Sequence, residues 1–245
     1  MSEERVDGVS RSRRLVDGLR AGAAASLPVG ALVLVSAGLE GTWIWPRGLA
    51  FAGGHAAISM AGAVALALFK PATLRVRRQG VVAPPERRQP LIDAVGTVAL
   101  MVYWLAWLIF IPVDVFQFRL LPPPPRLVAD LGGALALFGL LLNQLAVWQN
   151  PFSAPNVQDQ SAGGQRVIDH GVYGLIRHPI YAGNLLLFSG AALWLGSTAA
   201  FVGVSVLLVA TIGRILVEEA YLRANLSGYE AYARRVRGRL IPGLL

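Results

Sequence analysis

The feature that most constrains this chain is a series of long apolar runs with almost no charge. A transmembrane helix needs about 20 mainly apolar residues, because that length crosses the ~30 Å hydrocarbon core of a bilayer. Four runs are each long enough for one crossing: residues 21–39, 48–69, 94–113 and 131–149. We therefore expect an all-α, polytopic membrane helix bundle, since helices satisfy their own backbone hydrogen bonds in lipid.

The last apolar run, residues 179–213, is too long for a single crossing. As one helix it would measure roughly 50 Å, well beyond the hydrocarbon core. Gly196, Ser197 and Thr198 interrupt the run near its middle. We predict two short antiparallel helices there and six spans in all; five spans is the alternative, if this hairpin dips into the membrane without crossing it.

Basic residues concentrate in residues 11–20, 70–88 and 223–239, and these segments share one side if the number of spans is even. The positive-inside rule then predicts that both termini are cytoplasmic. The loops also account for the net charge of +8, so we do not expect a nucleic-acid partner. The chain has no cysteine, which excludes disulfides, thiolate metal sites and a cysteine nucleophile. The composition is typical of bacteria, and we expect an integral protein of the inner membrane.

Three parts follow from this pattern. Residues 1–20 are expected to form a cytoplasmic tail, residues 21–149 a four-span scaffold, and residues 150–245 a catalytic region. The third part opens with a polar, glycine-containing segment, residues 150–177, which is too long for a simple turn. Long ordered loops in compact proteins are usually functional.

Three clusters of polar residues stand in the third part. The first, Asp169 to Gly183, reads DHGVYGLIRHPIYAG, and the second contains Arg214, Glu218 and Glu219. The third runs from Gly228 to Pro242. Taken singly, the first could be an interfacial anchor, the second a salt-bridged helix exit, and the third a basic amphipathic surface helix. The paired carboxylates could instead hold a cation, because the helix dipole disfavours negative charge at a C-terminal end.

The order and spacing of these clusters resemble the isoprenylcysteine carboxyl methyltransferase family and its phospholipid N-methyltransferase relatives. The resemblance covers about residues 150–242. The matching elements, in order, are Phe152-Ser153, Gly171 and Tyr173, the motif Arg177-His178-Pro179-Ile180-Tyr181-Ala182-Gly183, the pair Glu218-Glu219, the motif Gly228-Tyr229-Glu230-Ala231-Tyr232, and Arg239-Leu240-Ile241-Pro242. Bulkier residues stand in that family where this chain has Gly174 and Ala182.

The resemblance implies a cytoplasm-facing pocket for S-adenosyl-L-methionine that is capped by the C-terminal helices. Carboxylates suit the cationic groups of this cofactor, and aromatic rings can stack on its adenine or face its sulfonium. A helix start favours an anion near Pro179. The expected cofactor-binding residues are Val157, Gln158, His170, Tyr173, His178, Pro179, Tyr181, Glu218 and Glu219.

The expected acceptor is a lipophilic small molecule or a lipid, with a carboxylate favoured. Arg214 is the first candidate to hold that carboxylate, with Glu218 as its catalytic partner, while Arg177 and Arg235 are weaker substrate-binding candidates. An amine acceptor would instead need a base, for which Glu218 or His178 is suited. We expect no metal. The alternatives are a phospholipid or amine N-methyltransferase, an NADPH-dependent membrane reductase of related architecture, and a non-enzymatic scaffold or transporter.

Overall fold

The structure is a computed structural model that describes residues 9–41, 44–78, 91–154 and 164–244, and its elements there are helices. Five of them are long and apolar enough to cross a membrane, which confirms the predicted polytopic helix bundle. The described elements are α1 (Arg11–Glu40), α2 (Pro46–Phe69), α3 (Pro71–Arg77), α4 (Leu91–Val113) with the π-helical turn Asp114–Phe118, α5 (Arg126–Gln149), the 3₁₀ turn Gly171–Gly174, α6 (Pro179–Leu195), α7 (Thr198–Asn225) and α8 (Tyr229–Arg235).

The hairpin predicted in the last apolar run is present as α6 and α7. Gly196 ends α6 in a left-handed conformation (φ 94°), and Ser197 begins α7 by accepting a hydrogen bond from the Ala200 amide. The prediction of two short helices is wrong for α7, which continues to Asn225. Its apolar run ends near residue 213, but the helix extends beyond it because the following stretch is rich in Arg, Leu, Glu and Ala, which are good helix formers. At 17 residues, α6 measures about 25 Å and is shorter than the hydrocarbon core.

Two further boundaries differ from the prediction. The first span was expected to begin at residue 21, but α1 begins at Arg11, where the Ser10 side chain accepts a hydrogen bond from the Arg13 amide. Half of the expected N-terminal tail is therefore helical. At the other end, the basic stretch 228–242 is helical only from Tyr229 to Arg235.

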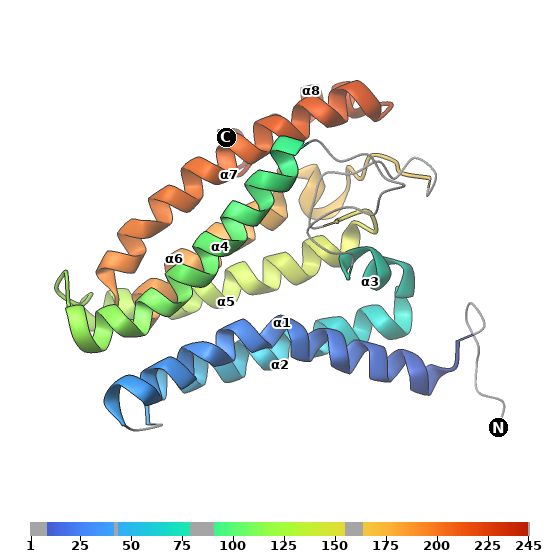
Figure 1. Cartoon of the computed structure of the whole chain (residues 1–245). Helices are drawn as coiled ribbons and strands as arrows, with labels where there is room; N and C mark the ends of the chain where they lie inside the picture. The colour runs from blue at the N-terminus through green and yellow to red at the C-terminus, as the bar shows by residue number, and fades with distance from the viewer. Residues whose placement is uncertain (1–8, 42–43, 79–90, 155–163, 245) are drawn as a thin grey trace.

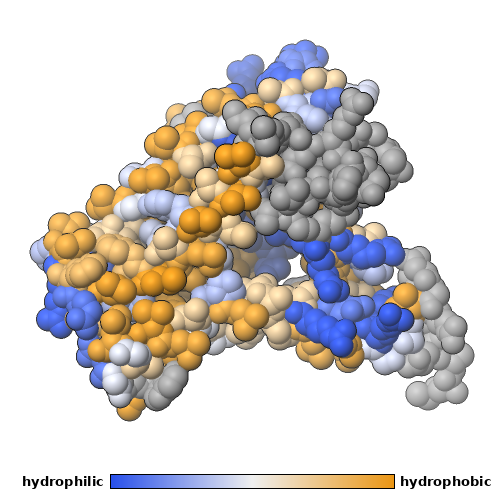
Figure 2. Space-filling view, in the orientation of Figure 1, coloured by the Kyte–Doolittle hydropathy of each residue, from blue (hydrophilic) through white to orange (hydrophobic). Residues whose placement is uncertain are grey.

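The two ends of the bundle differ: short helices and a loop segment lie at one end, and turns between long helices lie at the other (Figure 1). At one end lie α3, α8 and the segment that leads into α6; we call this the site end. At the other lie the end of α1, the start of α2, and the connections α4–α5 and α6–α7; we call this the turn end. Hydrophobic residues cover much of the visible sides of the bundle, and hydrophilic residues gather near its ends (Figure 2). This distribution suits helices that stand in a bilayer with polar ends in water.

The turn end is fixed by a buried carboxylate. The Ser197 hydroxyl donates to Asp114 Oδ2 at 2.6 Å, and the Leu120 amide donates to Asp114 Oδ1 at 3.0 Å. Asp114 therefore joins the end of α4 to the α6–α7 turn and positions the two helices that carry the site. Because α6 ends and α7 begins at this anchor, the anchor fixes how the two helices run side by side toward the site end.

The helices α5 and α6 pack backbone against backbone through glycines. A Cβ atom at Gly190 would lie 2.3 Å from the Ala136 amide nitrogen, and one at Gly139 would lie 2.5 Å from the Gly183 carbonyl oxygen. Small residues at such interfaces allow close approach, which supplies the van der Waals contact that holds helices together in lipid.

Replacing Gly190 by valine is expected to separate α5 from α6 and to destabilise the protein by about 1–3 kcal/mol, the usual cost of overpacking. Thermal unfolding in detergent measures this loss. Gly213→Val is the matched control, because a Cβ at Gly213 meets nothing within 4 Å. Equal unfolding temperatures for the two variants would contradict the close packing described here.

Candidate functional site

A cavity of about 500 Å³ opens at the site end of the bundle. Its walls come from α4, α6, α7 and α8 and from the two chain segments that flank the undescribed residues 155–163. The lining includes an ionisable group from each of several elements, among them Arg77, Tyr173, His178 and Glu218. This is a volume suited to a small organic molecule, with apolar walls and a few polar groups that could orient it.

The end of α5 places Tyr173 in this cavity. Gln149 Oε1 accepts a hydrogen bond from the Val172 amide at 2.9 Å and holds the 3₁₀ turn against α5. Gly171 permits this contact, because its φ is +58° and a Cβ there would meet the Gln149 side chain at 2.4 Å. Burial raises the pKa of Tyr173 to about 12, with a smaller opposing effect from Asn150. The phenol is therefore neutral at physiological pH and can donate a hydrogen bond.

Glu219 lies beside the cavity in a buried ion cluster. Its Oε1 accepts a hydrogen bond from Arg177 Nε at 2.8 Å and lies 3.2 Å from His178 Nε2. Its Oε2 lies 3.3 Å from Arg239 Nε and 3.7 Å from the Arg223 guanidinium. The Glu219 side chain is only 4% exposed. The buried negative charge of Glu219 is stabilised by the several cations around it. Removal of one of these partners is expected to destabilise the folded protein strongly.

Arg177 also ties the C-terminal segment to the start of α6. Its guanidinium Nη1 donates to the carbonyls of Val236 at 2.5 Å and Arg237 at 2.9 Å. The backbone amides of Arg177 and His178 donate to the carbonyls of Gly238 and Arg239, both at 2.9 Å. One side chain thus links α7, the beginning of α6 and the residues after α8, and these form one side of the cavity.

A second polar chain runs along the cavity wall from α7 to α4. The Tyr181 hydroxyl donates to Glu218 Oε2 at 2.7 Å and accepts from Arg214 Nε at 2.7 Å. Arg214 also hydrogen-bonds the Thr97 hydroxyl of α4. Arg214 and Glu218 are four residues apart on α7, and the Tyr181 hydroxyl of the neighbouring helix joins them. The rings of Tyr181 and His178 stack, with centroids 5.6 Å apart.

Arg214 also borders a second, more apolar cavity. This space of about 470 Å³ lies between α4 and α7. Small residues open it, and its lining consists of Gly96, Ala99, Leu100, Tyr103, Val206, Leu207, Ala210, Gly213, Arg214 and Val217. The bond between Arg214 and Tyr181 therefore connects an apolar space among the membrane helices with the polar cavity at the site end.

Tyr229 is the polar group of the cavity that lacks a partner in the described part of the chain. Its side chain lines the cavity and is 4% exposed, and its hydroxyl oxygen is buried without a hydrogen bond there. Burial, and after it the nearby carboxylates of Glu219 and Glu218, raise the pKa of Tyr229 above its ordinary value. Burial of a hydroxyl without a hydrogen bond destabilises the folded protein. A ligand that formed a hydrogen bond with the Tyr229 hydroxyl would remove this cost.

The structure distributes the predicted site residues unevenly. Six of them line the cavity: Tyr173, Arg177, His178, Pro179, Tyr181 and Glu218. Glu219 stands behind the lining and Arg214 borders the second cavity. His170 and Arg235 are exposed, and Arg235 pairs with Asp169 at the surface. Val157 and Gln158 lie outside the described residues.

Other lining residues were not predicted. Arg77 of α3 reaches the cavity and donates to the Ser153 carbonyl at 3.3 Å, and Thr97, Met101 and Trp104 contribute from α4. In the sequence Arg77 is one basic residue of a charged loop, and the α4 residues are part of an apolar run. No local pattern distinguishes them. Tyr229 and Tyr232 lay in a motif that the resemblance had already marked.

Comparison with known families adds one finding. Residues 128–227 match the family described as phospholipid methyltransferase. This confirms the predicted resemblance and supports a membrane methyltransferase. The matched segment contains nearly all of α5 and the whole of α6 and α7, and so most of the cavity lining. It begins after α4 and ends before Tyr229. A comparison with curated proteins finds no match.

Proposed function

We propose that this protein is an S-adenosyl-L-methionine-dependent methyltransferase that acts on a lipophilic acceptor. The observation that carries the proposal is the cavity at the site end, which combines an available carboxylate, Glu218, with the rings of Tyr173, Tyr181 and Tyr229. It lies largely within the segment that matches a methyltransferase family. The cofactor is the one that the family resemblance implies, and the cavity indicates which side chains would bind it.

The residues present fit this cofactor. Its sulfonium and ammonium groups are cationic, and Glu218 and the tyrosine rings suit cations. Its carboxylate would bind a guanidinium, and Arg77 and Arg166 are both among the lining residues. The unpaired Tyr229 hydroxyl supplies a further hydrogen bond. When bound, the cofactor supplies an electrophilic methyl group. Glu219 acts in this proposal through the residues it holds, Arg177 and His178, and not by direct contact.

The second cavity suits an apolar acceptor. Its walls consist mainly of α4 and α7 side chains within the membrane helices, and Arg214 stands at the end that meets Tyr181. A carboxylate head could bind Arg214 while the apolar body occupies the space between α4 and α7. Methyl transfer to a carboxylate that is already ionised needs little acid-base help, so positioning and exclusion of water supply most of the rate.

The chain's residues then have separate tasks. Arg214 orients the acceptor carboxylate, and Tyr181 connects Arg214 to Glu218. Glu218 holds positive charge in the cavity. The segment after α8, fixed by Arg177, covers one side and limits the entry of water. An acceptor of the isoprenylcysteine type satisfies these requirements. With an amine acceptor, Glu218 or His178 would have to remove a proton.

A titration of the detergent-purified protein with S-adenosyl-L-methionine and, in parallel, with NADPH tests the cofactor. We expect saturable binding of the former only. Incubation of membranes with methyl-labelled cofactor then identifies the acceptor in the lipid phase. Binding of NADPH alone, which Arg77 and Arg166 could support through its phosphate, would refute the methyltransferase assignment and favour a reductase.

Tyr229→Phe tests the site more specifically, because it is expected to maintain or raise the unfolding temperature while it lowers the affinity for the cofactor. The variant should unfold at the same or a higher temperature than the wild type, since it removes a buried hydroxyl without a partner among the described residues. Its affinity for the cofactor should fall about fivefold, the value of one ordinary hydrogen bond.

Tyr232→Phe is the matched control. The Tyr232 hydroxyl donates to the Tyr173 carbonyl at 2.8 Å, so this variant should lose stability instead. Calorimetric titration and thermal unfolding measure both quantities. Unchanged cofactor affinity in Tyr229→Phe would remove that hydroxyl from the proposed site.

A further inference from the structure

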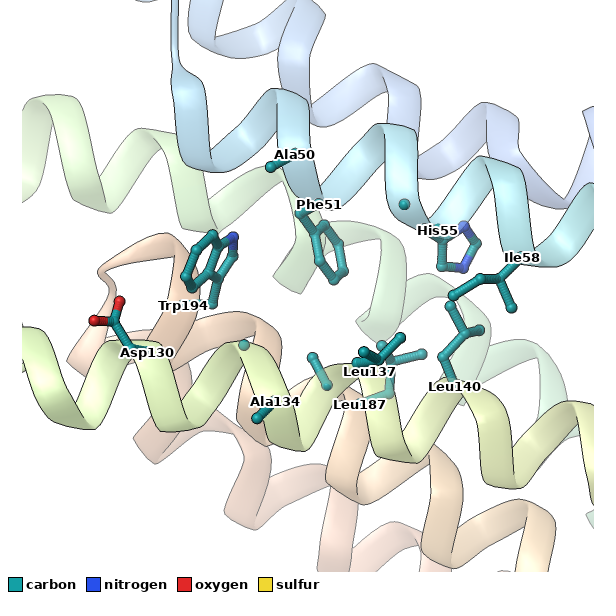
Figure 3. Close-up of a pocket in the computed structure, with 13 residues that line it drawn as sticks. Ala50, Phe51, His55, Ile58, Asp130, Ala134, Leu137, Leu140, Leu187 and Trp194 are labelled. Atoms are coloured by element: carbon teal, nitrogen blue, oxygen red, sulfur yellow. The ribbon is translucent and has the colours of Figure 1, made fainter.

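An apolar groove separates α2 from α5 and α6, away from the site described above. The helix α2 packs closely on α1 but meets α5 and α6 over few residues. The space left between them has a volume of about 280 Å³. In Figure 3 the Phe51 and Trp194 rings lie in the space between the helices, with Asp130 at one end and His55 and Ile58 at the other.

The length of the groove matches one leaflet of a bilayer. Along α2 its lining runs from Ala50 to Ile58, and along α5 from Asp130 to Leu140. At 1.5 Å per residue these stretches measure about 12 Å and about 15 Å, which is close to half of the ~30 Å hydrocarbon core. The groove begins near the turn end, where α2 and α5 start, and ends near the middle of the helices.

The rim of the groove carries net positive charge. Arg47 donates to the Trp194 carbonyl at 3.1 Å and lies 3.5 Å from Asp130 Oδ1. Arg126 lies 3.8 Å from Asp130 Oδ2, and its side chain is 92% exposed. Two guanidiniums thus share one carboxylate. Guanidinium groups bind phosphate well, and their charge is suited to an anionic headgroup at the membrane surface.

We propose that this groove binds a glycerophospholipid, with one acyl chain between α2 and α5 and the phosphate at Arg47 and Arg126. The apolar lining, the length of one leaflet and the charged rim together identify this ligand. The site is separate from the proposed methyltransferase cavity, and it does not depend on the function of that cavity.

His55 lies at the deep end of the groove, where an acyl chain and a lipophilic molecule with a polar group would make different contacts. Its Nδ1 is buried without a hydrogen-bond partner among the described residues, and its ring lies against Phe51 with centroids 6.2 Å apart. An acyl chain needs no hydrogen bond at this depth, whereas a lipophilic molecule with a deep polar group would bond His55. Replacement of His55 therefore distinguishes the two.

Gly54 and Gly53 provide a matched pair of variants. A Cβ at either position meets nothing within 4 Å, but only Gly54 is among the residues that line the groove. Gly54→Leu should fill the groove without a clash at the Cβ, and Gly53→Leu should add the same side chain elsewhere on α2. Both variants are expected to fold.

Native mass spectrometry of the delipidated protein, titrated with dioleoyl phosphatidylglycerol, tests the proposal. We expect one tightly bound lipid in the wild type, in Gly53→Leu and in His55→Leu. Gly54→Leu should bind about tenfold more weakly, because at least two methylenes lose their contacts. Arg126→Gln should bind about fivefold more weakly, the effect of one basic residue at a membrane surface.

Three results would overturn the proposal. Equal binding by Gly54→Leu and Gly53→Leu would show that the lipid binds elsewhere. Loss of binding in His55→Leu would indicate a ligand with a deep polar group. A wild-type dimer that binds no lipid would indicate that a second copy of the chain fills the groove.

Discussion

Arg177→Lys is expected to lower the unfolding temperature and to abolish binding of the proposed cofactor, although the substitution keeps the charge. Arg177 donates to Glu219 and to the carbonyls of Val236 and Arg237. A lysine ammonium concentrates its charge and its three N–H donors on one nitrogen atom and cannot reproduce the planar fork of a guanidinium. We expect a loss of about 2–4 kcal/mol, somewhat below the cost of deleting one partner of a buried ion pair. Thermal unfolding and cofactor titration in detergent measure the two effects.

Arg234→Lys is the matched control. Arg234 is 70% exposed, and its ion pair with Glu230, at 3.7 Å, lies within one helix at the surface. Exposed pairs contribute little to stability, so this variant should behave as the wild type. A wild-type unfolding temperature in Arg177→Lys would mean that the C-terminal segment is held by other contacts, and the role given to Arg177 would then be wrong.

Much of the fold could be predicted because membrane helices leave a strong local signal. The uncharged runs at 48–69 and 131–149 correspond closely to α2 and α5. The ends of α1 and α7 could not be predicted in the same way. Hydropathy reports where a chain can meet lipid, whereas a helix continues into water wherever caps and helix-forming residues allow it.

The adjacent carboxylates show why the site could be predicted only in part. Glu218 and Glu219 look equivalent in the sequence, and the resemblance marks both. Successive residues of a helix point about 100° apart, so the two side chains of α7 face different neighbours. Glu218 lines the cavity, while Glu219 is enclosed by Arg177, His178 and Arg239. Only the positions of the neighbouring segments separate a binding group from one that holds the structure together.

The contribution of α4 illustrates a second limit. Thr97 hydrogen-bonds Arg214 from more than one hundred positions away in the chain, and Trp104 lines the same cavity as Glu218. Both residues belong to an apolar run that gives no indication of a site. Contacts between distant helices depend on how the helices pack, and packing is decided by many side chains together.

Glu218→Gln and Arg214→Gln are expected to affect different ligands, although one hydroxyl joins the two residues. Glu218→Gln removes a negative charge from the cavity. The affinity for the cationic cofactor should fall about 10- to 100-fold, as when a hydrogen bond to a charged group is lost. Equilibrium titration with S-adenosyl-L-methionine measures this loss. Glu230→Gln is the control for the chemical change, since that side chain is 52% exposed and pairs at the surface with Arg223 and Arg234.

Arg214→Gln should leave the cofactor affinity within about twofold of the wild type and should raise the KM of a carboxylate acceptor about 10- to 100-fold, because its guanidinium is the proposed partner of that carboxylate. The guanidinium contacts two residues that line the cofactor cavity, Tyr181 and Thr97. Tyr181→Phe tests whether the contact with Tyr181 matters for the cofactor. That variant keeps Arg214 but removes its connection to Glu218. If Arg214→Gln and Tyr181→Phe both weaken the cofactor as much as Glu218→Gln does, the whole chain of contacts serves the cofactor. The acceptor carboxylate must then be held by another group.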